Sequence, residues 1–172
     1  RQENWSHLRF DHDGYEGWVD NKQLALCETP NFDPDQRVID LSSIVDLGDR
    51  QVLLPYGAVL PFYADGSILF LGQRVPVNAV TSHGHSGERM ELIETFMHPF
   101  LGAPYLWGGR TPSGVDCSGL TQMLFMLMGI YLPRDAAQQA EEGDTVELLD
   151  LAEPGDLAFF DNAEGRIVHV GI

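Results

Sequence analysis

The stretch Pro104-Tyr-Leu-Trp-Gly-Gly-Arg-Thr-Pro-Ser-Gly-Val-Asp-Cys-Ser-Gly-Leu-Thr-Gln-Met-Leu-Phe-Met-Leu-Met-Gly129 is the most specific part of this 172-residue chain. A glycine-rich loop leads to Asp116, and a nearly continuous apolar segment follows from Leu120 to Met128. Asp116 is a favourable N-cap, and Gly129 stands where helices commonly end in a left-handed residue. The pattern predicts a buried central helix of about 18 Å between these two residues.

Cys117 takes the first position of the predicted helix. Unpaired backbone N–H groups and the helix dipole favour an anion there, so this position promotes a nucleophilic thiolate. A cysteine is also commonly a small, buried core residue. The glycines before the helix, together with the small residues Ser118 and Gly119, leave the helix start open and favour the nucleophile.

Five motifs, which follow one another in a fixed order between residues 86 and 172, resemble those of the NlpC-type cysteine peptidases. The resemblance implies a papain-like fold, with the nucleophile on a helix and its base on an adjacent strand. It also implies action on the stem peptides of bacterial peptidoglycan. The motifs are Tyr105-Leu-Trp-Gly-Gly, Asp116-Cys-Ser-Gly, Leu132-Pro-Arg-Asp135 followed by Gln138-Gln139, Pro154-Gly-Asp-Leu-Ala-Phe-Phe160 and His169-Val-Gly-Ile172.

The N-terminal half has the short, alternating pattern of β-strands separated by turn residues. Trp5 to Phe10 and Tyr15 to Val19 predict two strands, and Val59 to Leu71 predicts a hairpin around Asp65-Gly66. Short strands with Gly and Pro turns favour a small barrel. This half resembles the bacterial SH3-like domain that often precedes an NlpC-type domain.

The predicted fold class is therefore α+β, with a small SH3-like β-barrel followed by a papain-like peptidase domain. The expected boundaries are 1–77 for the barrel, 78–86 for a linker and 87–172 for the peptidase domain. The start of the barrel and the end of the peptidase domain are expected to be missing. Ser86 is the predicted N-cap of a helix with an apolar face. That face carries Leu92, Ile93, Phe96, Met97 and Phe100.

A C-terminal hairpin is predicted from Asp156–Phe160 and Arg166–Ile172. Because side chains alternate along a strand, Val168, Val170 and Ile172 share one face, while Ile167, His169 and Gly171 share the other. A strand histidine is more often a satisfied core residue. Beside a cysteine at a helix start, it fits the base of a Cys117–His169 pair that performs nucleophilic catalysis.

The family resemblance assigns further site residues. The position of Cys117 at the helix start makes its backbone N–H a candidate donor to the oxyanion, and the resemblance implies that the hydroxyl of Tyr105 lies in the same site. Asp116 and Ser118 are expected to hold a free L-Ala amine. Tyr56 is expected either to close the site from the SH3-like domain or to be a surface tyrosine of the barrel. Because Asn and Asp are near-equal N-caps, Asp116→Asn is expected to cost little stability. The third polar residue of the catalytic set is expected beyond Ile172.

The expected reaction is hydrolysis of the bond between γ-D-glutamate and the diamino acid of murein stem peptides, with a requirement for a free N-terminal L-Ala. Two other classes of function stay open. One is an amidase or transferase that uses the same Cys–His pair on another acyl donor. The other is a catalytically weak protein that binds wall peptides. Product analysis separates these classes.

The composition of the chain argues against several other classes of binding partner. The formal charge of −16 and the pI near 4.4 argue against nucleic acid and anionic membranes, and no apolar run is long enough to insert into a bilayer. His83 and His85 have no neighbouring carboxylate or thiol, so no metal and no cofactor is expected. Cys27 and Cys117 are expected to be free thiols, and the protein a monomer. Envelope, extracellular and cytoplasmic locations all fit.

Overall fold

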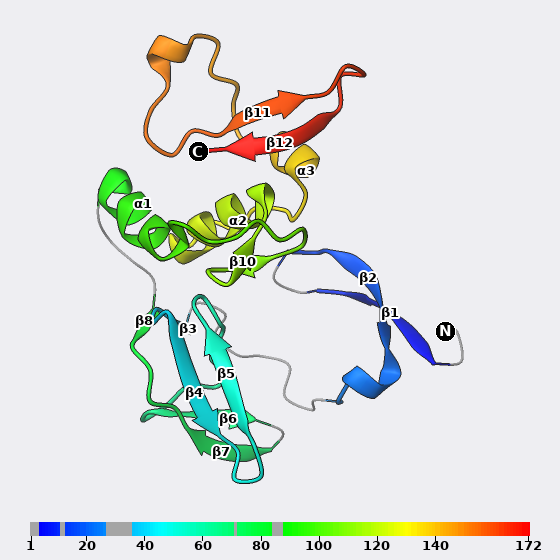
Figure 1. The fold of residues 1–172 in the computed structure, drawn as a ribbon, viewed down its shortest axis with the longest axis vertical. Helices are drawn as coiled ribbons and strands as arrows, with labels where there is room; N and C mark the ends of the chain where they lie inside the picture. The colour runs from blue at the N-terminus through cyan, green and yellow to red at the C-terminus, as the bar shows by residue number, and fades with distance from the viewer. Residues whose placement is uncertain (1–3, 11–12, 27–35, 71, 84–87) are drawn as a thin grey trace. The chain divides into compact units, whose positions relative to one another are not determined.

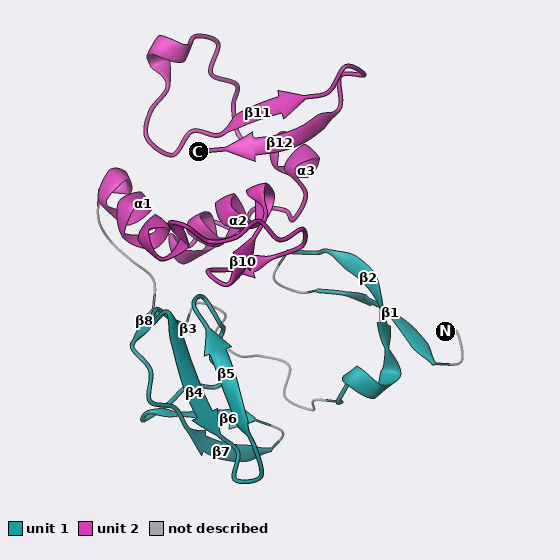
Figure 2. Cartoon of the chain, in the orientation of Figure 1, with its two compact units in different colours: residues 1–83 teal, residues 84–172 magenta. Residues whose placement is uncertain are grey.

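The computed structural model describes residues 4–10, 13–26, 36–70, 72–83 and 88–172 (Figure 1). The chain separates into two compact units, Arg1–His83 and Gly84–Ile172, which are called unit 1 and unit 2 (Figure 2). The predicted linker over 78–86 overlaps unit 1, because Thr81–His83 form strand β8. The predicted cap Ser86 lies outside the described residues.

Unit 1 consists of short antiparallel strand pairs, as the alternating sequence pattern predicts. Strand β1 pairs with β2, β3 with β8, β4 with β5, and β6 with β7. The elements are β1 (Trp5–Arg9), β2 (Glu16–Asp20), the 3-10 turn η1 (Asn21–Gln23), β3 (Gln36–Val38), β4 (Ser42–Asp46), β5 (Gln51–Pro55), β6 (Ser67–Phe70), β7 (Gln73–Pro76) and β8 (Thr81–His83).

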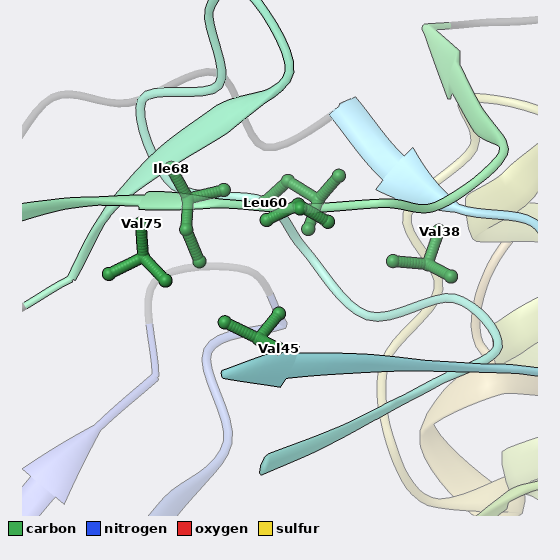
Figure 3. Close-up of a cluster of buried hydrophobic side chains, with 6 residues drawn as sticks. Val38, Val45, Leu60, Ile68 and Val75 are labelled. Carbon is green, nitrogen blue, oxygen red and sulfur yellow. The ribbon is translucent and has the colours of Figure 1, made fainter. Parts of the chain in front are cut away.

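The core of unit 1 is a cluster of branched aliphatic side chains from these strands, from the segment between β5 and β6, and from the residue that follows β7. Figure 3 shows Ile68 and Val75 directed toward Val45, with Leu60 beside them. Burial of such side chains contributes about 1.5–3 kcal/mol each and compensates for the short strand pairs. The cluster consists of Val38, Val45, Leu60, Ile68, Val75 and Val77.

Two details of unit 1 differ from the sequence prediction. The described strands form two-stranded sheets and do not close into a barrel, so the SH3-like assignment is not confirmed. The Asp65-Gly66 turn is present, with φ of 50° and 71°, but Val59 to Tyr63 do not form its first strand. Instead β6 pairs with β7, which follows it directly in the chain.

Unit 2 places two helices and a β-hairpin around α2. Helix α1 buries Ile93 and Phe96, and Phe100 is buried in the 3-10 turn that follows, as the predicted apolar face requires. Glu88 occupies the N-cap position of α1. The elements are α1 (Arg89–Met97), η2 (His98–Phe100), β9 (Arg110–Thr111), β10 (Gly114–Val115), α2 (Cys117–Leu127), α3 (Ala136–Gln139), η3 (Leu149–Leu151), β11 (Ala158–Asp161) and β12 (Ile167–Gly171).

Both ends of α2 confirm the sequence prediction. Asp116 is the N-cap and accepts a hydrogen bond from the Gly119 N–H. At the C-terminal end Gly129 has φ of 81°, and the Ile130 N–H donates to the Phe125 carbonyl at 2.8 Å. This 6→1 bond with a left-handed glycine is a Schellman motif. Most of the side chains of α2 are buried, so the helix is the centre of unit 2.

The C-terminal hairpin is also present, and it packs against α2 and α3 through β12 (Figure 1). Its register is irregular: Phe160 pairs with His169, while Asp161 pairs with Ile167. Val168 is therefore an extra residue, and it is 57% exposed although Val170 is only 2% exposed. The simple alternation predicted for this strand is interrupted by a β-bulge next to His169. Bulges commonly redirect a side chain beside a functional site.

Candidate active site

The glycine-rich loop lies directly against the start of α2. The Asp116 N–H donates to the Gly109 carbonyl at 3.2 Å, and that carbonyl lies where a Cβ on Gly119 would be. A Cβ on Gly109 would in turn meet the backbone of Gly114. The glycines are therefore required for close approach of the two backbones, which holds the loop against the residues on both sides of Cys117.

This packing predicts that Gly119→Ala lowers the free energy of unfolding of unit 2 by about 1–3 kcal/mol, although alanine favours helices. The added methyl group must displace the Gly109 carbonyl, so alkylation of Cys117 should change as well. Gly129→Ala is the control at the other end of α2. Its Cβ meets open space, and the left-handed φ alone costs about 1–2 kcal/mol. Urea unfolding measures the stability of both variants, and iodoacetamide labelling measures the reactivity of Cys117 in each. Unchanged stability in Gly119→Ala would contradict the close approach.

Cys117 is the first residue of α2 and is partly exposed. The alternative of a fully buried core cysteine is therefore wrong for this position. The first turn of α2 contains no acidic side chain that would repel a thiolate from within the helix. Cys117 is thus accessible at a helix N-terminus, as its position in the sequence predicts. Cys27 lies outside the described residues.

The Asp116 carboxylate receives four hydrogen bonds. Its Oδ1 accepts from the Gly119 N–H at 2.7 Å and from Arg134 Nη1 at 3.0 Å. Its Oδ2 accepts from the Gly108 N–H at 2.6 Å and from Arg134 Nη2 at 2.7 Å. The Asp116 side chain is 5% exposed and the Arg134 side chain is 11% exposed. Asp116 therefore joins the loop, the helix start and Arg134.

These contacts set the ionisation of Asp116. Burial by itself raises the pKa of Asp116, but the hydrogen bonds from Arg134, Gly119 and Gly108 and the charge of Arg134 outweigh it. The net pKa of Asp116 lies below its ordinary value. The side chain next to Cys117 is accordingly an anion that is neutralised by a bidentate guanidinium.

Arg134 is the principal site residue to which sequence analysis assigned no role. Its Nη1 also donates to the Ser118 hydroxyl at 2.9 Å, so it contacts both residues that flank Cys117. The signal in the sequence is the motif Leu132-Pro-Arg-Asp135, but nothing in that motif shows which acidic residue Arg134 pairs with. Its partner Asp116 lies 18 positions earlier in the chain.

A buried polar network fixes the segment that carries Arg134. Gln139 Nε2 donates to the carbonyls of Pro133 at 2.9 Å and Ser118 at 3.0 Å, while the Thr121 hydroxyl donates to Gln139 Oε1 at 2.7 Å. Gln122 Nε2 donates to the Leu132 carbonyl at 3.0 Å. The backbone on the N-terminal side of Arg134 is thus held against α2 independently of the guanidinium.

The structure brings the strand of His169 to the helix of Cys117, because β12 packs against α2. The imidazole is solvent-exposed, and its ring centroid lies 5.7 Å from that of Phe160 on the paired strand. Val170, the residue after His169, is buried. Val168, the residue before His169, is exposed because the bulge interrupts the alternation of buried and exposed side chains there. The fold supplies the helix and adjacent strand that a Cys–His pair requires.

The two tyrosines of the sequence prediction have different environments. Tyr105 is 68% exposed, and its backbone is fixed beside Val115 because the Leu106 N–H donates to the Val115 carbonyl at 3.1 Å. Tyr105 therefore lies in the loop that packs on the helix start. Tyr56 is in unit 1, is 3% exposed, and burial raises its pKa to about 12. It is not the surface tyrosine that was the alternative to a site residue.

The described residues contain no group of three or more His, Cys, Asp or Glu side chains placed to hold a metal ion. His85, one of the two histidines weighed for metal binding, lies outside them. Within the same part of the chain, every helix is too short or too polar to cross a membrane.

Comparison with known proteins finds similar sequences and one similar structure. Residues 102–172 match the model of the NlpC/P60 family. Two curated relatives are named gamma-D-glutamyl-L-lysine dipeptidyl-peptidase. The Bacillus subtilis protein is 34% identical over 175 residues, which cover 95% of this chain and 58% of the relative. The Bacillus cereus protein is 41% identical over 181 residues, which cover 93% and 54%. The chain thus spans somewhat more than half the length of these relatives.

The fold is shared with a solved structure. The crystal structure of an NlpC/P60 family protein from Bacillus cereus ATCC 10987 superposes with a TM-score of 0.80, at 24% identity, over 99% of this chain and 64% of that protein. This structural likeness shows a shared fold, and the match of residues 102–172 to the NlpC/P60 model supports the resemblance predicted for the C-terminal half. Residues 102–172 are similar to the NlpC/P60 family, and nearly the whole chain is similar to two proteins named gamma-D-glutamyl-L-lysine dipeptidyl-peptidase.

Proposed function

We propose that this chain belongs to a cysteine peptidase that hydrolyses peptidoglycan stem peptides, with Cys117 as the nucleophile and His169 as the general base. The observation that carries the proposal is the partly exposed cysteine at the first position of α2, with the histidine strand β12 packed against the same helix. An NlpC/P60 match over these residues and two relatives named as dipeptidyl-peptidases support it.

In the proposed mechanism, His169 takes the thiol proton and the Cys117 sulfur attacks the scissile carbonyl carbon. The resulting tetrahedral oxyanion is stabilised by the backbone N–H of Cys117 and the hydroxyl of Tyr105. The imidazolium then protonates the leaving amine, which departs and leaves a thioester on Cys117. Water, deprotonated by His169, hydrolyses the thioester and regenerates the thiol.

The proposed bond is the one between γ-D-glutamate and the diamino acid. The names of the two relatives specify γ-D-glutamyl-L-lysine, which supports this bond for the present chain. The proposed requirement for a free L-Ala amine rests on the resemblance, with Asp116, Ser118 and Tyr56 as the assigned contacts. The hydrogen bonds in the structure show that Asp116 and Ser118 already bind Arg134. A substrate ammonium would therefore compete with this guanidinium.

Product analysis tests the proposal. The protein is incubated with L-Ala-γ-D-Glu-L-Lys and with the N-acetylated tripeptide, and products are identified by mass spectrometry. We expect L-Ala-D-Glu and free lysine from the first substrate and little product from the second. Release of alanine alone, or transfer of the dipeptide to an added amine without hydrolysis, would contradict the peptidase assignment. Equal cleavage of both substrates would contradict only the free-amine requirement.

A further inference from the structure

Two opposing charges lie beside Cys117, and they come from distant parts of the chain. Asp116 precedes the cysteine directly, while Arg134 lies between α2 and α3. The carboxylate is required as the cap of α2 and as the acceptor for the loop N–H of Gly108. An anion at this position opposes formation of a thiolate on the next residue, because like charges at short range disfavour each other. The cap that orients Cys117 thus carries an electrostatic cost.

We propose that Arg134 is a positioning residue for Cys117, which neutralises the Asp116 carboxylate and ties it to Ser118 so that the cap no longer repels the thiolate. The inference deepens the proposed function and rests on Cys117 as its nucleophile. Arg134 acts through Asp116 and Ser118 and is not itself a catalytic residue. A planar guanidinium suits this task, because its fork reaches both carboxylate oxygens while one nitrogen also reaches the hydroxyl.

The arrangement of the neighbouring backbone supports a positioning role. The carbonyls of Leu132 and Pro133 are held by Gln122 and Gln139, so the guanidinium is delivered from an ordered segment. The Gly119 N–H and the Gly108 N–H fix the carboxylate from the other side. Each member of the pair is thus held by the fold as well as by its partner, and little entropy is lost in pairing them.

Other charged or titratable groups lie on the elements and segments around α2, and all four proteins of the experiment contain them. They are Arg110 on β9, His169 on β12, Asp135 before α3, the exposed phenol of Tyr105, and Arg89, Glu91 and Glu94 on α1. A double-mutant cycle over residues 116 and 134 cancels their contributions to first order, because they are present in all four proteins.

The experiment measures the rate of iodoacetamide labelling at Cys117 against pH, with the labelled peptide quantified by mass spectrometry. The proteins are the parent, Arg134→Gln, Asp116→Asn and the double variant. Arg134→Gln should raise the pH of half-maximal labelling by about one unit, because the carboxylate is no longer neutralised. Asp116→Asn should lower it by about one unit, and the double variant should return close to the parent value. Labelling needs no peptide substrate. The labelling result can therefore be interpreted even if the protein does not cleave the proposed peptide.

Arg134→Lys separates charge from geometry. An ammonium retains the charge but cannot bridge both Asp116 oxygens and the Ser118 hydroxyl at once. Its labelling midpoint should therefore stay close to that of the parent. If the proposed function also holds, the kcat of Arg134→Gln should be about tenfold below that of the parent at pH values below the labelling midpoint. The kcat should return to the parent value at higher pH, and KM should change much less.

The result that overturns the proposal is a folded Arg134→Gln variant whose labelling midpoint equals that of the parent. A shift of the labelling midpoint in the same direction in Arg134→Gln and Asp116→Asn would overturn it too. Removing a positive and a negative charge should shift the midpoint in opposite directions, whereas a structural disturbance need not depend on the sign of the charge. If Arg134→Gln does not fold, Asp116→Asn and Arg134→Lys decide. An unchanged or raised labelling midpoint in Asp116→Asn would refute the electrostatic role. A shifted labelling midpoint in Arg134→Lys would refute it as well. Circular dichroism establishes which variants are folded.

Discussion

Replacing Cys117 by alanine is expected to lower kcat/KM for L-Ala-γ-D-Glu-L-Lys by roughly 10⁴- to 10⁶-fold, because in the proposed mechanism the Cys117 sulfur forms the acyl intermediate. His169→Ala should have an effect of similar order, since the thiol then lacks the base that takes its proton. The double variant should be no worse than the stronger single variant, because the two groups act as one unit. Substrate binding to Cys117→Ala should persist, as measured by calorimetry.

Two substitutions serve as controls for this expectation. His98→Ala removes an exposed histidine of the same unit, and Cys27→Ser removes the only other cysteine in the sequence. Both should retain the parent rate. Hydrolysis that survives in Cys117→Ala would exclude the thiol mechanism, whereas additive losses in the double variant would indicate that Cys117 and His169 do not act together.

The second large effect is expected in stability, for Asp116→Asn. An asparagine places an N–H₂ group where one carboxylate oxygen accepts hydrogen bonds, and it removes the charge that neutralises Arg134. Loss of one partner from a buried ion pair costs about 3–5 kcal/mol in the free energy of unfolding. This prediction replaces the expectation from capping alone, that the change costs little, because the Asp116 carboxylate also binds Arg134. Urea unfolding of unit 2 measures the difference.

Asp135→Asn is the matched control, because Asp135 is the exposed N-cap of α3 in the same unit. Asparagine and aspartate are near-equal caps, so this change should cost no more than a few tenths of a kcal/mol. Equal losses for the two variants would show that the ion pair with Arg134 contributes nothing beyond capping.

The pH dependence gives an independent check on the same ion pair. The pKa of Asp116 in the folded protein lies below its ordinary value, so the unfolded chain binds the proton more tightly. The stability that Asp116 contributes is therefore fully present above about pH 4 and is lost as the pH falls through the folded pKa. The difference in unfolding free energy between the parent and Asp116→Asn should narrow as the pH decreases from about 6 to 2.

Local features of unit 2 were predictable because they depend on a few neighbouring residues. The cap at Asp116 and the Schellman end at Gly129 are set by residues within one turn of each helix end. The apolar face with Ile93 and Phe96 follows from helical spacing alone. The position of Cys117 at the start of α2 is fixed by the same local signals, so the candidate nucleophile was visible in the sequence.

Pairings across the chain were not predictable from these patterns. Strand β3 pairs with β8, which lies more than 40 residues later in the chain. Strand β6 pairs with β7, although the Asp65-Gly66 turn predicted that β6 would pair with the segment that precedes the turn. The bulge beside His169 is equally invisible, because alternation in the sequence does not reveal an extra residue in the register. Each depends on which segments bury apolar surface together.

The sequence by itself determined that Cys117 begins a helix, that Asp116 caps it and that His169 lies on a strand of the C-terminal hairpin. Only the tertiary structure decided that Arg134 binds Asp116 and Ser118, because that contact requires the chain to return across the helix start. Capping is a local property of adjacent residues. The charge balance beside the thiol depends instead on how α2 and the segment before α3 pack against each other.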